Sequence, residues 1–143
     1  MGKRRRAREL AIQVLFHMEY NPGDPSESFE RVCESFGPPR DIRAYSREVV
    51  VGVWENRATI DRLIRRSSKN WRVERMSRVD RNILRMAIYE VLYRKDVPPK
   101  VSIDEAVELG KQYGTEESGA FINGILDHIY NQLKAEEVDH QGE

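Results

Sequence analysis

The start of the chain concentrates the residues best suited to binding a polyanion. Residues 1–8 hold five basic residues and no acidic one, namely Lys3, Arg4, Arg5, Arg6 and Arg8. Guanidinium groups make bidentate contacts with phosphates and stack on bases, and a cluster of them raises the local positive potential. The pattern indicates a nucleic-acid surface at the N-terminus, although a short basic run is equally compatible with a solvated tail.

Two aromatic residues are candidates for base stacking beside this cluster. On the first predicted helix the buried stripe centres on Ala11, and Arg5 and Phe16 project from one side at about 120° and 140° from it. RNA recognition combines such basic groups with aromatic platforms for unstacked bases. Phe121 lies at the edge of the apolar stripe of the last predicted helix. For both aromatic residues the alternative is partial burial in the core.

Nothing in the sequence indicates catalysis, a metal site or a cofactor site. The chain has no phosphate-binding or dinucleotide-binding glycine motif and no zinc-ligand spacing, and its three histidines are scattered. Cys33 is the only cysteine, which excludes an internal disulfide, and it falls on the inward stripe of its helix. We therefore expect no catalytic residue, metal or cofactor. The basic run at 57–75 is interpreted as a solvated helix face.

Length and composition favour one soluble domain. The 143 residues include 24 basic and 24 acidic side chains and are 39% hydrophobic, which suits a single core beneath a charged surface. The apolar runs are far shorter than a membrane span, and no signal core follows the basic start. We expect a cytoplasmic protein with one domain at residues 1–135 and a disordered polar tail at 136–143.

Apolar periodicity predicts an all-α fold of about seven helices. Six are expected at about 3–20, 25–36, 41–56, 78–96, 103–113 and 118–133, and one more follows the third almost at once and carries Ile60, Leu63 and Ile64. Three helix starts are marked by capping patterns, which are Asp24 with Glu27, Ser77 with Asp80, and Ser102 with Glu105. The helix after Ser77 is apolar around most of its circumference, so it is predicted to be the central helix of the fold.

Three stretches of the sequence form a combined motif. They are RRRARELA with Gln13 and Leu15-Phe16; VDR with ILRMAIYE; and the segment from Val97-Pro98 through VSIDEAVEL and Tyr113-Gly114 to Ser118 and FINGILD. Together they resemble the NusB family of bacterial transcription antitermination factors, from about residue 4 to residue 130. The combination is specific, whereas the arginine run alone is not. Residues 21–40 match no motif of that family.

The resemblance implies a function in transcription and a fold of about seven helices in two packed subdomains. NusB proteins bind boxA, a short single-stranded element of nascent ribosomal RNA, together with the ribosomal protein NusE, and the complex joins other Nus factors on RNA polymerase. By position, the resemblance assigns RNA binding to Arg4, Arg5, Arg6, Arg8, Phe16, Glu117 and Phe121. It assigns partner binding to Asp80 and Arg85, and it leaves monomer and homodimer both open.

Other interpretations fit the same residues. NusB-like domains also occur at the N-terminus of certain ribosomal RNA cytosine methyltransferases, but the chain has no room for a cofactor-binding α/β domain and only one cysteine. A helical protein-interaction adaptor with an incidental basic start would bind proteins and not RNA. A helix-turn-helix DNA reader is a weaker alternative, because no recognition helix stands out.

Overall fold

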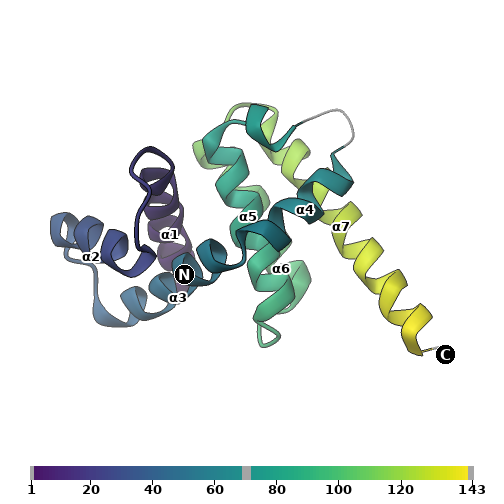
Figure 1. Ribbon diagram of the computed structural model, residues 1–143, viewed down its shortest axis with the longest axis horizontal. Coiled ribbons are helices and arrows are strands. Elements are labelled where there is room, and N and C mark those ends of the chain that lie inside the picture. The colour runs from purple at the N-terminus through teal and green to yellow at the C-terminus, as the bar shows by residue number, and fades with distance from the viewer. Residues whose placement is uncertain (1, 69–71, 142–143) are drawn as a thin grey trace.

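The computed structural model describes residues 2–68 and 72–141, and these residues are helical with no strand. Residues 69–71, which belong to the predicted basic run, lie outside the described residues. The described chain forms seven α-helices and one 3-10 turn at Val73–Arg75 (Figure 1). The α-helices are α1 (Lys3–Tyr20), α2 (Pro25–Phe36), α3 (Arg40–Glu55), α4 (Arg57–Ser67), α5 (Arg78–Tyr93), α6 (Pro99–Tyr113) and α7 (Ser118–Gln141). The predicted all-α fold is confirmed.

The helices form two groups that meet at α5. Figure 1 shows α1, α2 and α3 on one side of the molecule and α4, α5, α6 and α7 on the other. α5 packs against α1 and α3 of the first group and against α4, α6 and α7 of the second. The two packed subdomains implied by the resemblance are therefore present, and α1 lies at their boundary. No described helix combines the length and the apolar character that a membrane span requires.

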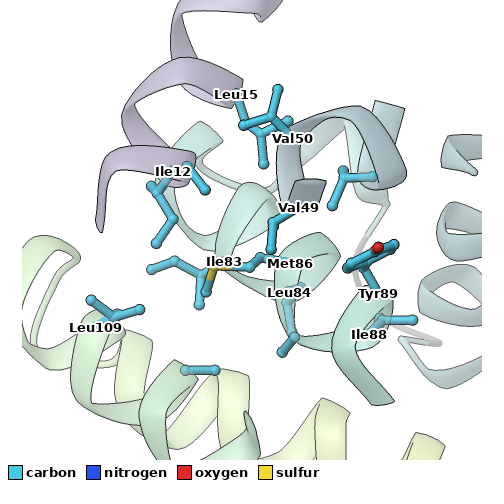
Figure 2. Close-up of a cluster of buried hydrophobic side chains, with 14 of the residues drawn as sticks. Ile12, Leu15, Val49, Val50, Ile83, Leu84, Met86, Ile88, Tyr89 and Leu109 are labelled. Atoms are coloured by element: carbon cyan, nitrogen blue, oxygen red, sulfur yellow. The ribbon is translucent and has the colours of Figure 1, made fainter. Parts of the chain in front are cut away.

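α5 is the central helix, as its apolar circumference predicts. Most of its residues are buried. Figure 2 shows apolar side chains of α1, α3 and α6 packed against those of α5. They include Ile12 from α1, Val49 from α3, Met86 from α5 and Leu109 from α6. The backbone of α3 comes so close to α5 that a Cβ at Gly52 would lie 2.1 Å from the Tyr89 ring. Only glycine fits this approach without movement of the ring.

Two of the three predicted capping patterns are confirmed. The Asp24 carboxylate accepts the Glu27 N–H at 3.0 Å, and the Ser77 hydroxyl accepts the Asp80 N–H at 3.1 Å. At the other end of α2, Gly37 adopts the left-handed conformation that commonly ends a helix. These helix ends follow local rules, which is why the sequence alone predicts them.

The third capping pattern is wrong. α6 begins at Pro99, one turn before the predicted start, and proline suits this position because the first helical N–H needs no helical partner. Ser102 and Glu105 therefore lie inside α6. Their side chains contact α5 and α1 instead of capping their own helix.

α7 is longer than predicted. It continues to Gln141, eight residues past the predicted end at Leu133, and Figure 1 shows its last turns extending past α6. The polar tail expected at 136–143 is thus helical as far as Gln141, and 142–143 lie outside the described residues. The eight added residues, about two turns, include strong helix formers such as Lys134, Ala135 and Glu137. In addition, the Arg66 guanidinium donates to the Glu136 carboxylate at 3.0 Å.

Candidate nucleic-acid interface

Three of the predicted arginines lie at the surface of the first turn of α1. Arg6 is exposed and forms no ion pair within the described residues. Arg4 is exposed and its guanidinium lies 3.9 Å from the centre of the Tyr45 ring on α3. Arg5 is part-buried and donates from Nε and Nη2 to the Glu105 carboxylate on α6, at 3.0 and 2.8 Å. The three side chains thus present positive charge along one end of α1, and two of them are held in place by neighbouring helices.

Arg8 does not belong to this surface. Its side chain is 3% exposed and donates to the Glu90 carboxylate from Nε at 2.8 Å and from Nη2 at 3.1 Å. Its Nη1 lies 3.7 Å from Glu105. A guanidinium buried with both its contacts inside the protein cannot reach RNA in this conformation. The structure thus separates Arg8 from its exposed neighbours, which the sequence does not reveal because Glu90 is 82 residues away, and a role of Arg8 in RNA binding stays a prediction.

Glu90 is the centre of a buried polar network that joins four helices. Besides Arg8 on α1, it accepts the Tyr45 hydroxyl from α3 at 2.6 Å and the Ser102 hydroxyl from α6 at 2.7 Å. Burial, together with the hydrogen bond to Glu90 and its charge, raises the pKa of Tyr45 above its ordinary value, so the phenol stays protonated and donates. The network fixes α1 against α5 and α6, and so fixes the direction of the surface arginines.

A second contact holds α1 beside the end of α6. The Tyr113 hydroxyl at the end of α6 donates to the Glu9 carboxylate on α1. The short turn after Tyr113 leads to Glu117, which is exposed, and to Phe121, which is half-buried and packs against the core. The Phe121 N–H bonds the Glu117 carbonyl at 3.0 Å, so both residues lie at the N-terminal turn of α7. The Tyr113–Glu9 bond thus joins α1 to the end of α6, and the two predicted α7 residues follow in the next turn of the chain.

We expect Glu9→Gln to lower the pKa of Tyr113. The hydrogen bond to Glu9, partial burial and the Glu9 charge raise this pKa to about 12. Because the folded pKa lies above the ordinary value of about 10, the contact stabilises the fold below that value, and the stabilisation is lost as the pH rises through about 12. Nuclear magnetic resonance of the tyrosine ring carbons would follow the titration. Glu108→Gln, on the same helix as Tyr113, is the control, and an unchanged Tyr113 titration in Glu9→Gln would contradict the contact.

A row of flat side chains continues the surface along α1. Phe16 is half-buried, and its ring centre lies 5.4 Å from that of Tyr20, one turn further on. The Tyr20 side chain is 55% exposed. The Arg78 guanidinium from α5 lies 4.1 Å above the Tyr20 ring and bonds its hydroxyl at 2.6 Å. The sequence analysis did not predict that Tyr20 and Arg78 would join Phe16 in this row. Tyr20 could have been found, because it follows Phe16 by one helical turn.

The two predicted partner-binding residues have different environments. Asp80 lies in the first turn of α5, and its Oδ1 is buried without a hydrogen bond within the described residues. Arg85 donates to both Asp61 carboxylate oxygens on α4, at 2.8 and 2.9 Å, and lies 3.5 Å from Glu19 on α1. Arg85 is therefore engaged within the protein, where it joins α1, α4 and α5, whereas Asp80 retains an unused acceptor.

Two further predictions concern residues outside this surface. Cys33 is buried and unpaired by a disulfide, and burial raises the pKa of its thiol, as for a core residue. In the basic run the described arginines are mostly exposed, and Arg65 pairs with Glu74 at 3.1 Å. Arg57 differs, because its guanidinium lies 3.4 Å from the centre of the Trp54 ring. The described part of the run is mostly a solvated face, as predicted, and it forms ion pairs with Glu74 and with Glu136 of α7.

Comparisons with known proteins identify the family. The model of the NusB family matches residues 5–131. The transcription antitermination protein NusB of Desulfatibacillum aliphaticivorans is 52% identical over 137 residues, which cover 96% of each chain. The NusB structure from T. maritima has a TM-score of 0.81 and 42% identity, and covers 88% of this chain and 89% of that one.

A third relative carries information about binding. It is a crystal structure of the antitermination factors NusB and NusE in complex with double-stranded RNA, with a TM-score of 0.81 and 30% identity. The match covers 92% of this chain and 98% of that one. Sequence, family model and fold therefore agree over nearly the whole length: the chain belongs to the NusB family.

Proposed function

We propose that the protein is a transcription antitermination factor that binds single-stranded boxA RNA of nascent ribosomal RNA together with the ribosomal protein NusE. The observation that carries the proposal is the first turn of α1, where Arg4, Arg5 and Arg6 remain at the surface while Arg8 anchors the helix internally. Relatives named as antitermination proteins match over nearly the whole chain. The proposal treats residues 1–135 as one RNA-binding domain.

The arrangement suits an RNA strand lying along α1. The surface arginines would hold backbone phosphates, and the Phe16–Tyr20–Arg78 row would receive unstacked bases. Glu117 and Phe121 at the start of α7 would border the strand on the other side. Phosphate contacts supply affinity without sequence information, so base discrimination would come from this planar row and from α7.

NusE would contact the start of α5 at Asp80, next to Arg78 of the planar row, so the partner and the RNA would lie side by side there. Asp80 is half-buried and its Oδ1 is covered, so a partner donor would bond the part of the side chain that remains at the surface. Arg85 would act indirectly, by fixing α4 against α5. The protein would work by binding alone, in the cytoplasm, and would reach the other Nus factors and RNA polymerase through this complex, with no bond made or broken.

The test is a titration of a short labelled boxA-like RNA with and without NusE at two salt concentrations. Several arginine–phosphate contacts should make the affinity fall steeply with salt, and NusE should tighten binding. A duplex of the same sequence is included, because the related complex contains double-stranded RNA. Binding that is absent in every arm would leave a helical adaptor, and preference for the duplex would contradict the single-stranded target.

A further inference from the structure

A basic hollow lies between α2 and α3, and part of its lining falls within residues 21–40, which match no motif of the family. It has a volume of about 460 Å³. Three arginines of α3 line it, Arg40, Arg43 and Arg47, against a single acidic residue, Glu30 of α2. The rest of the lining is apolar. A concave surface with this excess of guanidinium groups attracts anions.

The three arginines stand on one face of α3. They are spaced by three and four residues, so their side chains follow one another along the helix, and the first and last Cα positions lie about 10 Å apart along its axis. Glu30 lies 2.7 Å from Arg43 and 3.5 Å from Arg47, so one carboxylate is shared between two guanidinium groups. Half of the Arg47 side chain remains exposed. The hollow therefore keeps unneutralised positive charge.

Arg40 occupies an electrostatically unfavourable position at the edge of the hollow. It is the first residue of α3, where the positive end of the helix dipole makes a cation unfavourable. It is exposed and forms no ion pair within the described residues. Sequences break such local rules mainly at functional sites, and a bound phosphate would turn the unfavourable charge into a favourable one.

The hollow continues into the surface of α1. A second hollow of about 340 Å³ lies between α1 and the α2–α3 loop. Its polar lining from α1 is Arg6, Glu9 and Gln13, and Glu9 is held by the Tyr113 hydroxyl. Pro38 lines both hollows. Beyond Arg47 the excess of basic residues ends, because the next hollow has three acidic residues, Glu27, Glu30 and Glu34, against Arg31 and Arg47. The path from Arg6 to Arg47 is thus continuous and bounded.

We propose that this groove, defined by Arg6, Arg40, Arg43 and Arg47, binds phosphates of the RNA segment that flanks the α1 site. The inference rests on the proposed function and adds a second contact region for the same strand. RNA fits better than an acidic protein segment, because a continuous polyanion held at α1 reaches the groove directly through Arg6. The contacts are to phosphates, so the groove would bind the flanking segment whatever its sequence.

The test compares a short boxA-like RNA with the same RNA extended by several nucleotides at each end. The variant is Arg40→Gln with Arg47→Gln, which leaves the closer Arg43–Glu30 pair intact. The control is Arg62→Gln with Arg72→Gln, which removes the same charge from two exposed arginines of the basic run. The wild type should bind the extended RNA roughly tenfold more tightly than the short one, the variant should lose this gain, and the control should keep it. Loss of two phosphate contacts should reduce the slope of log affinity against log salt by about 1.4.

Each outcome separates the two proposals. Normal binding of the short RNA without any gain from the extension, or a gain that survives in the variant, would overturn the groove and leave the proposed function intact. Failure of the wild type to bind the short RNA would overturn the proposed function. A variant that binds both RNAs normally but has reduced affinity for NusE would assign the groove to a protein and so contradict this inference. Circular dichroism and thermal unfolding verify that each variant is folded.

Discussion

Replacing Glu90 by glutamine is expected to lower the free energy of unfolding by about 3–5 kcal/mol, because it leaves a buried guanidinium without its counter-charge. Glu90 is 1% exposed and Arg8 is 2% exposed. Glutamine has nearly the same shape, so no cavity forms and the effect reports the charge and its hydrogen bonds. Urea denaturation followed by circular dichroism would measure it.

The expectation follows from the number of groups that depend on this carboxylate. Arg8, Tyr45 and Ser102 all donate to it, at 2.6 to 3.1 Å. Glu105 lies 3.7 Å from Arg8 and offsets only part of the lost charge. Since the network joins α1 to α3, α5 and α6, its loss should also loosen the first turn of α1, and RNA affinity should fall with stability.

Two further variants test whether the loss of stability comes from the buried charge. Glu108→Gln removes an exposed carboxylate that lies 3.5 Å from Lys111, and it should change the free energy by less than about 0.5 kcal/mol. Adding Arg8→Met to Glu90→Gln removes the orphaned buried charge and should recover part of the loss. Equal stability of Glu90→Gln and Glu108→Gln would show that the buried pair does not hold the fold.

The elements of this fold were predictable because their signals are local. The proline and glycine breaks, the Asp24 and Ser77 caps and the apolar surface of α5 depend on residues within a few positions of one another. The end of α7 was missed for a related reason. A polar segment looks like a tail in sequence, yet it remains helical when its residues favour the helix and one of them, Glu136, pairs with α4.

The ionic contacts were not predictable, because they join residues distant in the sequence. Ser102 and Glu105 have the spacing of a capping box, and the same spacing places two inward side chains on one face of a helix. Only the position of α1 and α5 decides between these roles. Arg8 was grouped with its neighbours by composition, although the buried stripe of α1 passes beside it. Glu90 offered one usable signal, since a carboxylate in a helix apolar on most sides requires a buried partner.

Reversing the charge at Arg4 and Arg6 is expected to weaken binding of the boxA-like RNA by about a hundredfold, with the largest loss at low salt. These two arginines are chosen because neither forms an ion pair within the described residues, so Arg4→Glu with Arg6→Glu should leave the fold stable. Arg5 is kept, because a carboxylate there would face Glu105. Fluorescence anisotropy with labelled RNA at two salt concentrations measures the loss.

The control for that experiment must carry the same change in net charge at another place. Arg62→Glu with Arg72→Glu alters two exposed arginines of the basic run, away from α1 in the sequence. If affinity fell equally in both variants, binding would depend on overall charge and not on a defined surface. A loss confined to the α1 variant would locate the RNA at the first turn of α1, where the buried Arg8–Glu90 pair determines the direction in which the free arginines point. Within one arginine run, the buried Arg8 would then stabilise the fold, and the exposed Arg4 and Arg6 would bind the RNA.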